Sequence, residues 1–433
     1  MRVLFLCNKS PWPPKEGGPM AMNMFIEGLI ESGNEVKVLA VNSFKFNISA
    51  DDIPAAYHRK TGIELIDVDL RVRPVDAFLN LFTGQSYHVK RFISANFRKR
   101  LIAILASGEF DVVQLETLFM CPYIDTIRKH SKAKIVLRAH NIEHFIWERI
   151  ADETKNPVKK WYIRHLADTL KNYEQKIISQ VDGLVAITPT DAEYFNSLKK
   201  NQKSNLKFQK SNLKSQISNL KSQISNLKSQ ISNFAPPVID IPFGINPSKY
   251  PHNNARAEFP SLFSLGSMNW IPNQEGIRWF LDNVWMDIHN QFPGLKYYLA
   301  GREMPEWMTS LNLPNVIVLG EVDDAVSFLA SKAIMIVPLF SGSGIRVKIV
   351  EGMAAGKTII STGIGAEGIG YTHLKNILIA DAPCEFFEMI SICVTDATLC
   401  EKIGGEARKL AETDYDAQIL VQKLTAFYQQ LPG

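Results

Sequence analysis

Residues 341–356 read SGSGIRVKIVEGMAAG and follow the short apolar run Ile334–Val337. The apolar run predicts a buried strand, the Gly/Ser segment predicts a turn, and Ile345–Ala355 has a helical pattern. A turn between a strand and a helix brings free backbone N–H groups and the positive end of the helix dipole to one point. The stretch therefore predicts an α/β fold with an anion site beyond the carboxyl end of a strand.

Three charged side chains follow this turn. Arg346 and Lys348 fall in the first helical turn, where a cation opposes the helix dipole unless an anion binds there. Glu351 comes two helical turns after Gly344 and can share its face. A carboxylate at that place can accept hydrogen bonds from a vicinal diol such as a ribose. We predict that the segment binds a diphosphate and a ribose; a solvated helix surface is the alternative.

The same strand–helix alternation continues along the chain in two series. The expected strands are Arg2–Cys7, Glu35–Val41, Ile63–Asp69, Val112–Leu115, Lys134–Ala139 and Gly183–Ile187, and then Ser261–Leu265, Lys296–Ala300, Asn315–Leu319, Ile334–Val337, Thr358–Ser361 and Ile377–Ala380. The expected helices are Pro19–Ser32, Phe92–Ser107, Tyr123–His130, Asn156–Gln180, Pro189–Leu198, Gln274–His289, Asp323–Ser331 and Ile345–Ala355. Two βαβ series predict two doubly wound α/β domains, with ligands in a cleft at the carboxyl ends of the strands.

The tract 203–233 separates the two series. NLKSQIS recurs there with a period of seven, and leucine and isoleucine alternate spacings of four and three, which is typical of a helical seam. Its flanks are weak helix formers, and its lysines have no acidic partners. We predict an insertion without a catalytic role; a single protruding helix and self-association are the alternatives.

Charge and cysteine content narrow the class of protein. The formal net charge of the 433 residues is +4, and the tract contributes six lysines and no acids, so the rest carries −2. A general nucleic-acid-binding surface is therefore not expected. Five scattered cysteines without a C-x-x-C pair suggest a reduced intracellular protein. Neither a signal peptide nor a spanning segment is recognisable, so we expect a cytoplasmic protein, or one peripheral on the inner face of a membrane.

Two further segments match the spacing of known binding motifs, but the elements predicted around them do not fit those motifs. Residues 363–368, GIGAEG, match G-x-G-x-x-G, but no helical pattern opens at the third glycine, so a loop over a ligand is the better interpretation. Residues 140–144, HNIEH, match an inverted zinc-protease pattern. His140 directly follows a strand, and no third ligand is apparent. We therefore expect no metal site and no cofactor, and place His140 as a polar group at a strand end.

Two segments of the first half carry weaker signals. Gly17 and Gly18 stand between a strand and a helix, which predicts a second helix N-terminus facing the cleft, with a simple turn as the alternative. The segment His88–Leu105 mixes five Lys or Arg residues with Phe and Leu. It could touch anionic lipid, but we favour the alternative, a core-facing helix with a solvated basic face.

Taken together, these segments resemble glycosyltransferase family 4, retaining enzymes of the GT-B architecture. GSGIRVKIVEGMAAG, residues 342–356, and its continuation in 358–368 are similar to the donor-site signature of the family. GSMNWIPN, residues 266–273, resembles the start of the donor domain, and RAHNIE, residues 138–143, resembles the acceptor-side strand-end motif. The resemblance covers most of the chain outside 203–233.

The resemblance implies a division of the chain and a set of site residues. It implies an acceptor-side Rossmann-like domain in 1–200, a donor domain in 234–413 and a helix crossing back in 414–433. The implied catalytic residues are His140 and Glu351. The implied donor-binding residues are Gly266, Asn269, Arg302, Ser343, Gly344, Arg346, Lys348 and Glu351. The implied acceptor-side loop residues are Gly17, Gly18, Asn141 and Glu143.

The sequence departs from the family pattern at two places. Many relatives have two glutamates separated by seven residues; Glu351 matches the second, but Ser343 occupies the first position. Many also have an arginine and a lysine after the first donor-domain strand, where this chain has Ser267 and Asn273. Arg346 and Lys348 can supply that positive charge from the Gly-rich turn.

The implied activity is transfer of a glycosyl group from a nucleotide-diphosphate sugar to a sugar or lipid-linked acceptor, with retention, in cell-surface polysaccharide or glycolipid synthesis. Membrane contact and self-association through 203–233 are further expectations about partners. A GT-B sugar-nucleotide epimerase and a non-catalytic nucleotide-sugar-binding protein remain the alternatives, followed by a Rossmann oxidoreductase.

Overall fold

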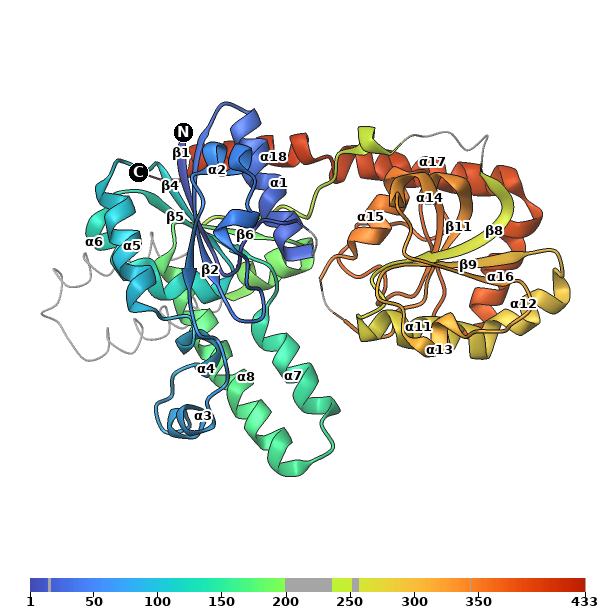
Figure 1. The fold of residues 1–433 in the computed structure, drawn as a ribbon, viewed down its shortest axis with the longest axis horizontal. Coiled ribbons are helices and arrows are strands. Elements are labelled where there is room, and N and C mark those ends of the chain that lie inside the picture. Colours follow the sequence, from blue (N-terminus) through green and yellow to red (C-terminus); the bar gives the residue numbers. More distant parts are fainter. Residues whose placement is uncertain (15–16, 199–235, 251–256, 343, 433) are drawn as a thin grey trace, which may run out of the picture. The chain divides into compact units, whose positions relative to one another are not determined.

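The computed structural model describes residues 1–14, 17–198, 236–250, 257–342 and 344–432. The predicted heptad tract 203–233 and the predicted donor residue Ser343 lie outside these ranges. The chain divides into two compact units: residues 1–242 together with 421–433, and residues 243–420. Each unit is built on one parallel sheet (Figure 1).

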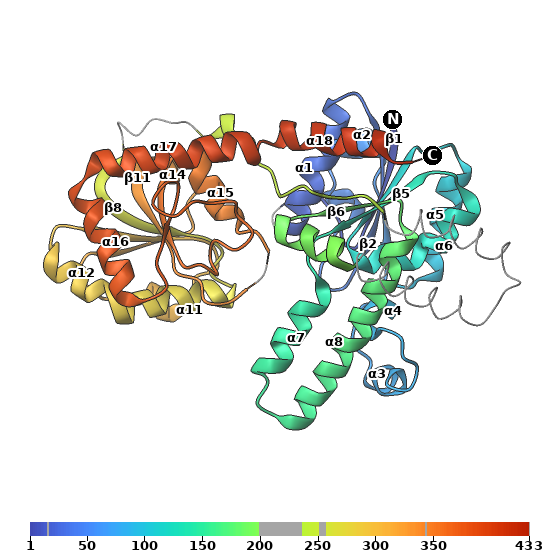
Figure 2. The same cartoon turned by 180° about the vertical axis from the view of Figure 1, so that it is seen from behind.

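The first unit contains a seven-stranded sheet in the order β3-β2-β1-β4-β5-β6-β7. Its strands are β1 (Arg2–Cys7), β2 (Glu35–Asn42), β3 (Glu64–Asp67), β4 (Val112–Glu116), β5 (Lys134–Ala139), β6 (Gly183–Ala186) and β7 (Val238–Asp240). All pairings are parallel, as in β1–β4 and β4–β5. Helices cover both faces (Figures 1 and 2), which is why the central strands are predominantly apolar.

The helices of the first unit include a long antiparallel pair. Residues 189–198 are helical, as predicted for Pro189–Leu198. The other helices before residue 180 are α1 (Gly17–Glu31), α2 (Ala55–Thr61), α3 (Pro74–Asn80), α4 (Tyr87–Lys90), α5 (Ala95–Ala106), α6 (Ile124–His130), α7 (Glu143–Glu153) and α8 (Pro157–Ile177). The Asn156 side chain caps α8 by accepting a 3.0 Å hydrogen bond from the Lys159 N–H. Helices α7 and α8 extend away from the sheet, on the side to which the loop containing α3 also projects (Figures 1 and 2).

The final helix, α18 (Ala417–Gln430), begins in the second unit and ends in the first. Val421 packs against Gly28 of α1, and Phe427 and Leu431 pack against Gly183 of β6. A side chain at either glycine would meet these residues at or below 3.0 Å. The two glycines therefore permit the close approach of the returning helix.

The second unit contains a six-stranded parallel sheet in the order β10-β9-β8-β11-β12-β13. Its strands are β8 (Glu258–Leu265), β9 (Lys296–Ala300), β10 (Val316–Gly320), β11 (Lys332–Val337), β12 (Thr358–Ser361) and β13 (Leu378–Ile379). Its helices are α11 (Ile271–Phe280), a π-helical turn (Leu281–Trp285), α12 (Met286–Gln291), α13 (Glu306–Thr309), α14 (Ala325–Ser331), α15 (Val347–Ala354), α16 (Pro383–Thr395) and α17 (Ala397–Asp414). Trp285, Tyr297, Phe280 and Phe386 fill the centre of its core.

The predicted fold class is confirmed: two doubly wound α/β units with parallel sheets are present. All twelve predicted strands occur with shifts of up to three residues at their ends, and β7 is an additional strand. The single helix predicted over Gln274–His289 is a continuous run of α11, the π-helical turn and α12, and it starts at Ile271. Within the described part of the chain, no helix combines the length and apolar character that a membrane span requires.

Candidate functional site

The Gly-rich turn of the second unit lies between β11 and α15. Gly342 and Gly344 adopt positive φ angles of 116° and 79°, a conformation that favours glycine. A side chain on Gly342 would also come within 2.9 Å of the Trp270 ring. Arg346 is the N-cap of α15 in an extended conformation. The predicted strand–turn–helix arrangement is therefore confirmed, with the N-terminus of α15 following the turn after β11.

Two cationic side chains lie at this helix terminus. The buried Arg346 guanidinium lies 5.7 Å from the centroid of the Trp270 ring and donates to the Gly344 carbonyl oxygen. Lys348 Nζ donates to Asn273 Oδ1 at 2.6 Å. Asn273 Nδ2 in turn donates to the Ser267 carbonyl oxygen at 2.8 Å. The turn after β8 and the start of α15 are therefore joined into one cationic site.

Gly266 explains how the two segments approach each other. A side chain there would lie 3.0 Å from Asn273 Nδ2 and 3.6 Å from Lys348 Nζ. Burial is the larger cause and the neighbouring charge of Arg346 the smaller one, and together they lower the pKa of Lys348 to about 7. A buried lysine with a lowered pKa beside a second cation is an environment that an anion would stabilise.

This lowered pKa predicts proton uptake when a diphosphate binds. The unfolded lysine has a pKa of about 10.4, so the folded chain holds fewer protons between about pH 7 and pH 10.4, and the contribution of Lys348 to stability rises with pH across that window. A bound diphosphate should raise the pKa of Lys348. At about pH 8, calorimetry in buffers of different ionisation enthalpy should therefore show uptake of roughly one proton. Equal uptake by the Lys348→Met variant would contradict this assignment.

Glu351 lies on the next turn of α15 and is held from the first residues of the second unit. Tyr250 Oη donates to Glu351 Oε1 at 2.9 Å. Burial raises the pKa of Glu351, and the Tyr250 hydrogen bond opposes that shift. The Tyr250 carbonyl oxygen accepts a 2.7 Å hydrogen bond from Arg408 Nη1 of α17. Glu351 is thus a half-buried acceptor with one defined partner.

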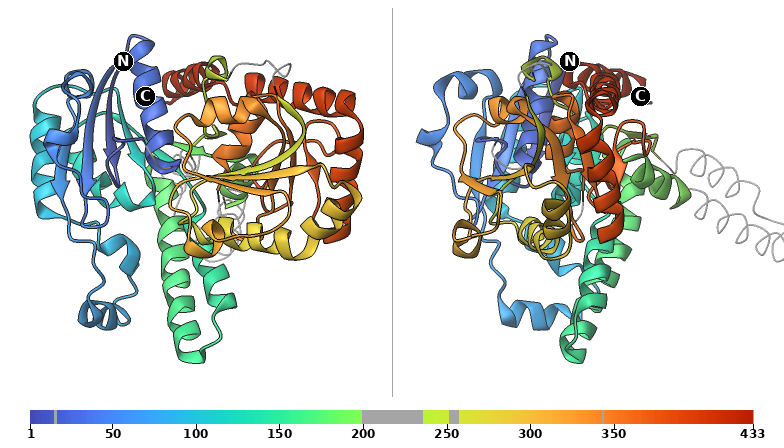
Figure 3. Two further views of the ribbon diagram at one scale, coloured as in Figure 1. Left: turned by 45° about the vertical axis from the view of Figure 1, so that its right-hand side comes forward. Right: turned by 90° about the vertical axis from the view of Figure 1, so that its right-hand side faces the viewer.

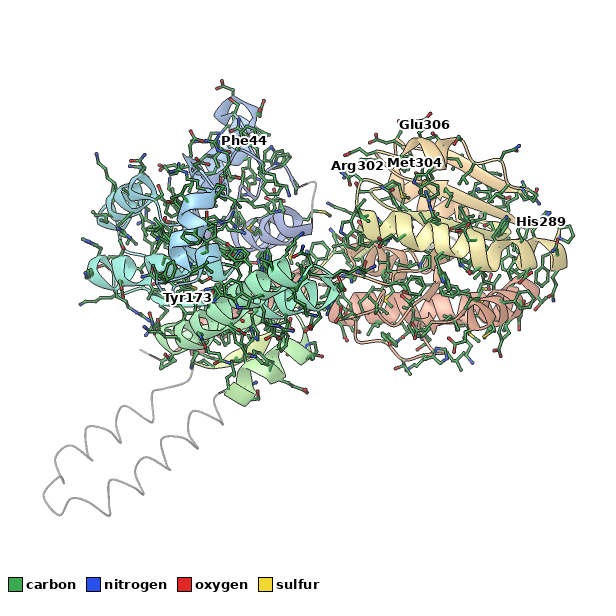
Figure 4. The ribbon with its side chains drawn as sticks, turned by 90° about the horizontal axis from the view of Figure 1, so that it is seen from below. Phe44, Tyr173, His289, Arg302, Met304 and Glu306 are labelled. Carbon is green, nitrogen blue, oxygen red and sulfur yellow. The ribbon has the colours of Figure 1, made fainter. Side chains whose placement is uncertain are left out.

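The remaining predicted donor residues surround the turns after β8 and β9. Asn269 Nδ2 donates to Glu303 Oε2 at 2.7 Å on the exposed side of these turns. The Arg302 carbonyl oxygen accepts from the Met268 N–H at 2.8 Å. In Figure 4, Arg302 lies beside Met304 and Glu306 in the segment after β9. The structure therefore brings Gly266, Arg346 and Lys348 together, while the side chain of Asn269 is engaged with Glu303.

Residues 363–368 form turns after β12 rather than the start of a helix. The Gly363 N–H donates to Asp381 Oδ1 at 2.8 Å, and the Gly365 N–H donates to Thr362 Oγ1 at 2.9 Å. A dinucleotide fingerprint needs a helix opening at its third glycine. The segment is a loop, as its sequence indicates.

In the first unit, His140 is bonded to a buried carboxylate that the sequence analysis missed. Glu116 ends β4 and is fully buried. Its Oε2 lies 2.6 Å from His140 Nε2 and 3.3 Å from Arg138 Nη1. Burial alone would raise the pKa of Glu116, but the Arg138 charge and the His140 hydrogen bond lower it to about 2. In the sequence Glu116 directly follows the predicted strand Val112–Leu115, but the sequence does not show that this strand neighbours the one that precedes His140.

His140 is kept neutral in this environment. Burial lowers its pKa, the Glu116 hydrogen bond opposes this, and the charges of Arg138 and Lys9 add to the lowering. Because Glu116 is ionised, it accepts the proton of His140 Nε2. The neutral ring then has Nδ1 as its remaining acceptor.

The buried network beneath His140 extends to the returning helix. Gln114 Nε2 donates to Glu116 Oε1, and Tyr428 Oη of α18 donates to Gln114 Oε1. All of these side chains except His140 are almost completely buried. The C-terminal helix therefore contributes a polar group to the network that orients His140.

The predicted acceptor-side residues lie at the same edge of the sheet. Gly18 is at the start of α1, and a side chain there would come within 3.0 Å of Lys9 Cε; Gly17 is the first residue of α1, and a side chain there would meet no atom within 4 Å. The charge of Lys9 in turn acts on His140. The loops after β1 and β5 therefore meet at this edge.

Asn141 and Glu143 lead from β5 into α7. Glu143 is the buried first residue of α7, and its N–H donates to Glu174 Oε1 of α8 at 3.1 Å. Burial and the Glu174 charge raise the pKa of Glu143 to about 8, although a hydrogen bond from Asn141 opposes them. Glu143 is therefore mostly protonated at neutral pH and can donate a hydrogen bond.

The two histidines of H-x-x-E-H have separate carboxylate partners. His140 bonds Glu116, whereas His144 Nδ1 bonds Glu174 and its Nε2 lies 3.3 Å from Tyr194 Oη. Among the described residues, no group of three His, Cys, Asp or Glu side chains is placed to hold a metal ion. The two histidines of this motif therefore belong to two separate histidine–carboxylate pairs.

Comparison with known proteins places these features in context. Residues 260–396 match a family described as "Glycosyl transferases group 1". A Klebsiella pneumoniae protein described as an uncharacterized 44.6 kDa protein in the cps region is 20% identical over 426 residues, covering 96% of this chain and 97% of that protein.

Several solved structures share the fold over the whole chain. A sucrose-phosphate synthase from Thermosynechococcus elongatus has a TM-score of 0.65 at 14% identity, covering 100% of this chain and 99% of its own. Anabaena Alr3699/HepE in complex with UDP has a TM-score of 0.64 at 13% identity, with both chains fully covered. The fold is therefore that of the GT-B glycosyltransferases, and together with the match over residues 260–396 it supports a glycosyltransferase.

Proposed function

We propose that this chain transfers a glycosyl group from a nucleotide-diphosphate sugar to an acceptor hydroxyl, with retention of configuration. The observation that carries the proposal is the Gly-rich turn at the N-terminus of α15, where Arg346 and Lys348 meet in the region matched by the glycosyl transferases group 1 family. Similar structures were obtained with UDP and with UDP-glucose, which supports a uridine nucleotide as the donor.

The proposed role of the second unit is to bind the donor and stabilise its leaving group. The bond between the anomeric carbon and the diphosphate oxygen breaks, and the departing diphosphate gains negative charge. Arg346, Lys348 and the N-terminus of α15 can offset that charge in a partly dehydrated site. Glu351 would accept hydrogen bonds from the ribose hydroxyls.

The proposed role of the first unit is to hold the acceptor. His140 would hydrogen-bond a sugar or acceptor hydroxyl through the nitrogen that does not contact Glu116, and Gly17, Gly18, Asn141 and Glu143 would line the acceptor side. As the bond from the acceptor oxygen to the anomeric carbon forms, the acceptor proton passes to the departing diphosphate. We assign the acceptor domain to residues 1–200 together with β7 (Val238–Asp240), which belongs to the same sheet, and the donor domain to the rest of 234–413. We assign the crossing helix to 414–433 and no catalytic part to 203–233.

The Klebsiella relative from a cps region supports a role in cell-surface polysaccharide synthesis. The acceptor would then be a sugar or a lipid-linked sugar, and the protein would act in the cytoplasm or on the inner face of the membrane.

Glu351→Gln should separate recognition of ribose from recognition of phosphate. Loss of a charged hydrogen-bond acceptor costs about 1.5–3 kcal/mol, so affinity for a nucleoside diphosphate should fall by about 10- to 150-fold. Affinity for inorganic pyrophosphate should stay the same, because that ligand has no ribose. Calorimetric titration with both ligands is the measurement, and an equal loss for both would mean that the substitution damages the fold.

The His140–Glu116 pair favours a second candidate, transfer with inversion. A neutral imidazole oriented by a buried carboxylate is a suitable general base. In that case the acceptor proton would pass to His140 Nδ1, and attack would occur on the face opposite the diphosphate. The anomeric configuration of the first product, read by proton NMR, distinguishes the two: an unchanged configuration supports retention, and an inverted one assigns His140 as the base.

The proposal as a whole can be tested by a thermal-shift screen of nucleotide sugars. A ligand at 100 times its Kd should add about 2.7 kcal/mol to stability. We expect a nucleoside diphosphate and one of its sugar derivatives to raise the Tm, and nicotinamide dinucleotides to leave it unchanged. Stabilisation by a nicotinamide dinucleotide alone would overturn the proposal.

A further inference from the structure

The short helix α3 presents its large apolar side chains to solvent. It buries only Ala77 and Asn80, one small and one polar residue. Val72, Val75, Phe78, Leu79 and Phe82, in and beside the helix, are all exposed, and Phe82 is 77% exposed. This is the reverse of the pattern of a helix that packs on a core. A contiguous exposed apolar patch of this kind marks an interaction site.

The orientation of α3 is fixed by its inner contacts. Ala77 packs in a small cluster with Tyr87 of α4 and with Leu166 and Tyr162 of α8. Tyr87 Oη accepts a 3.0 Å hydrogen bond from the Arg73 N–H, and Asn80 Nδ2 donates to the Gln85 carbonyl oxygen at 2.7 Å. The helix therefore cannot bury its apolar face by rotating without breaking these bonds.

The tip of the α7–α8 pair supplies a second exposed apolar group with a basic surround. Val158 and Trp161 of α8 are exposed, Trp161 by 61%. Four lysines or arginines lie in residues 154–164: Lys155, Lys159, Lys160 and Arg164. Arg164 pairs with Asp152, which together with Glu153 directly precedes this stretch, so Lys155 and Lys159 are the cations that the docking argument uses. Because α3 packs against Tyr162 and Leu166, the first turns of α8 lie next to it. Both elements project from the same end of the first unit in Figures 1 and 3.

We propose that these elements dock the first unit on a membrane with anionic headgroups. The docking surface consists of Val72, Val75, Phe78, Leu79, Phe82, Val158 and Trp161, with Lys155 and Lys159 beside it. Exposed aromatic and aliphatic side chains enter the headgroup region, where tryptophan is stable because one part of its ring is polar. The lysines add attraction to anionic lipid. The proposal does not depend on the proposed reaction.

The surface differs from the basic segment His88–Leu105 that the sequence singles out. Phe92, Phe97, Leu101 and Leu105 of that segment are buried in the core of the first unit. Arg100 pairs with Glu64, whose carboxylate also accepts from Lys37. That segment therefore packs its apolar face inward, and the apolar groups available to lipid are those of α3 and α8.

Co-sedimentation of the full chain with lipid vesicles tests the proposal. The probes are vesicles of phosphatidylcholine alone and of equal parts phosphatidylcholine and phosphatidylglycerol. We expect strong binding to the mixed vesicles only. Phe78→Ser with Phe82→Ser should lower the partition coefficient by about tenfold or more, since two aromatic rings leave the interface. Lys155→Glu with Lys159→Glu should lower binding to mixed vesicles and reduce its salt dependence.

Matched variants control for non-specific effects. Leu319→Ser replaces an exposed apolar residue of the second unit, and Lys129→Glu with Lys132→Glu reverses two exposed charges of the first unit near the amino end of β5. Both should bind vesicles as the unchanged chain does. Because all substituted residues are exposed, the Tm should stay the same. Unchanged vesicle binding by the Phe78/Phe82 and Lys155/Lys159 variants would overturn the proposal, as would a dimer that these variants dissociate without any vesicle binding.

Discussion

Replacing His140 by alanine should lower kcat for glycosyl transfer by about 10²-fold and leave the affinity for the nucleoside diphosphate nearly unchanged. The imidazole is held by the buried Glu116 through a 2.6 Å hydrogen bond. A polar contact made in the transition state contributes about 1.5–3 kcal/mol when one partner is charged, and a general base contributes about 10²–10⁴-fold. The measurement is steady-state transfer beside calorimetric titration of the diphosphate.

Two further variants make this prediction specific. His130→Ala removes an exposed histidine at the end of α6 and should leave kcat unchanged. Glu116→Gln keeps the size of the carboxylate but removes its charge, so the pH at which His140 titrates should fall and the pH profile of kcat should move with it. If His140→Ala retains full activity, His140 is a structural histidine and has no role in transfer.

Replacing Arg346 or Lys348 by alanine should weaken binding of both the nucleoside diphosphate and inorganic pyrophosphate. Loss of one charge-assisted contact costs about 1.5–3 kcal/mol, which corresponds to an increase in Kd of about 10- to 150-fold. Unlike Glu351→Gln, these variants should affect both ligands equally, because they remove phosphate contacts. Isothermal titration gives the Kd values directly.

The control for this pair is Lys402→Ala, which removes an exposed lysine of α17 in the same unit. It should bind both ligands as the unchanged chain does. Arg346 also contacts Gly344 and the Trp270 ring, so the Tm of each variant must be compared as well. Unchanged diphosphate affinity in folded Arg346→Ala and Lys348→Ala variants would refute the phosphate assignment.

The fold could be predicted from the sequence because buried parallel strands are continuously apolar. β1, β5, β9 and β12 match their predicted ranges. β7 was missed because its three residues, Val238–Asp240, give too short a pattern. The helix pair α7 and α8 was predicted only in part, because α7 has many charged and aromatic residues and follows directly on a strand-end motif.

The sequence predicts the parts of the candidate site that are close together in the chain, but not the contacts between residues that are far apart in the chain. The turn, Arg346 and Lys348 are close in sequence, so helix geometry alone places them together. Asn273 reaches Lys348 across 75 residues, and Glu116 reaches His140 across 24 residues, from neighbouring strands. Such contacts depend on strand order, which a single sequence does not fix. The hydrogen bond from Tyr428 to Gln114 joins residues 314 positions apart, and the sequence does not predict it for the same reason.

Product analysis with the full chain tests the central claim most directly. The chain is incubated with the nucleotide sugar that stabilises it, with and without acceptor extract, and the released nucleoside diphosphate and the glycosylated product are quantified. A transferase should release nucleoside diphosphate in equal amount to the new glycoside, and only slowly without acceptor. Interconversion of the nucleotide sugar without any acceptor would identify an epimerase. Binding of the nucleotide sugar with neither diphosphate release nor product would contradict the proposed transfer.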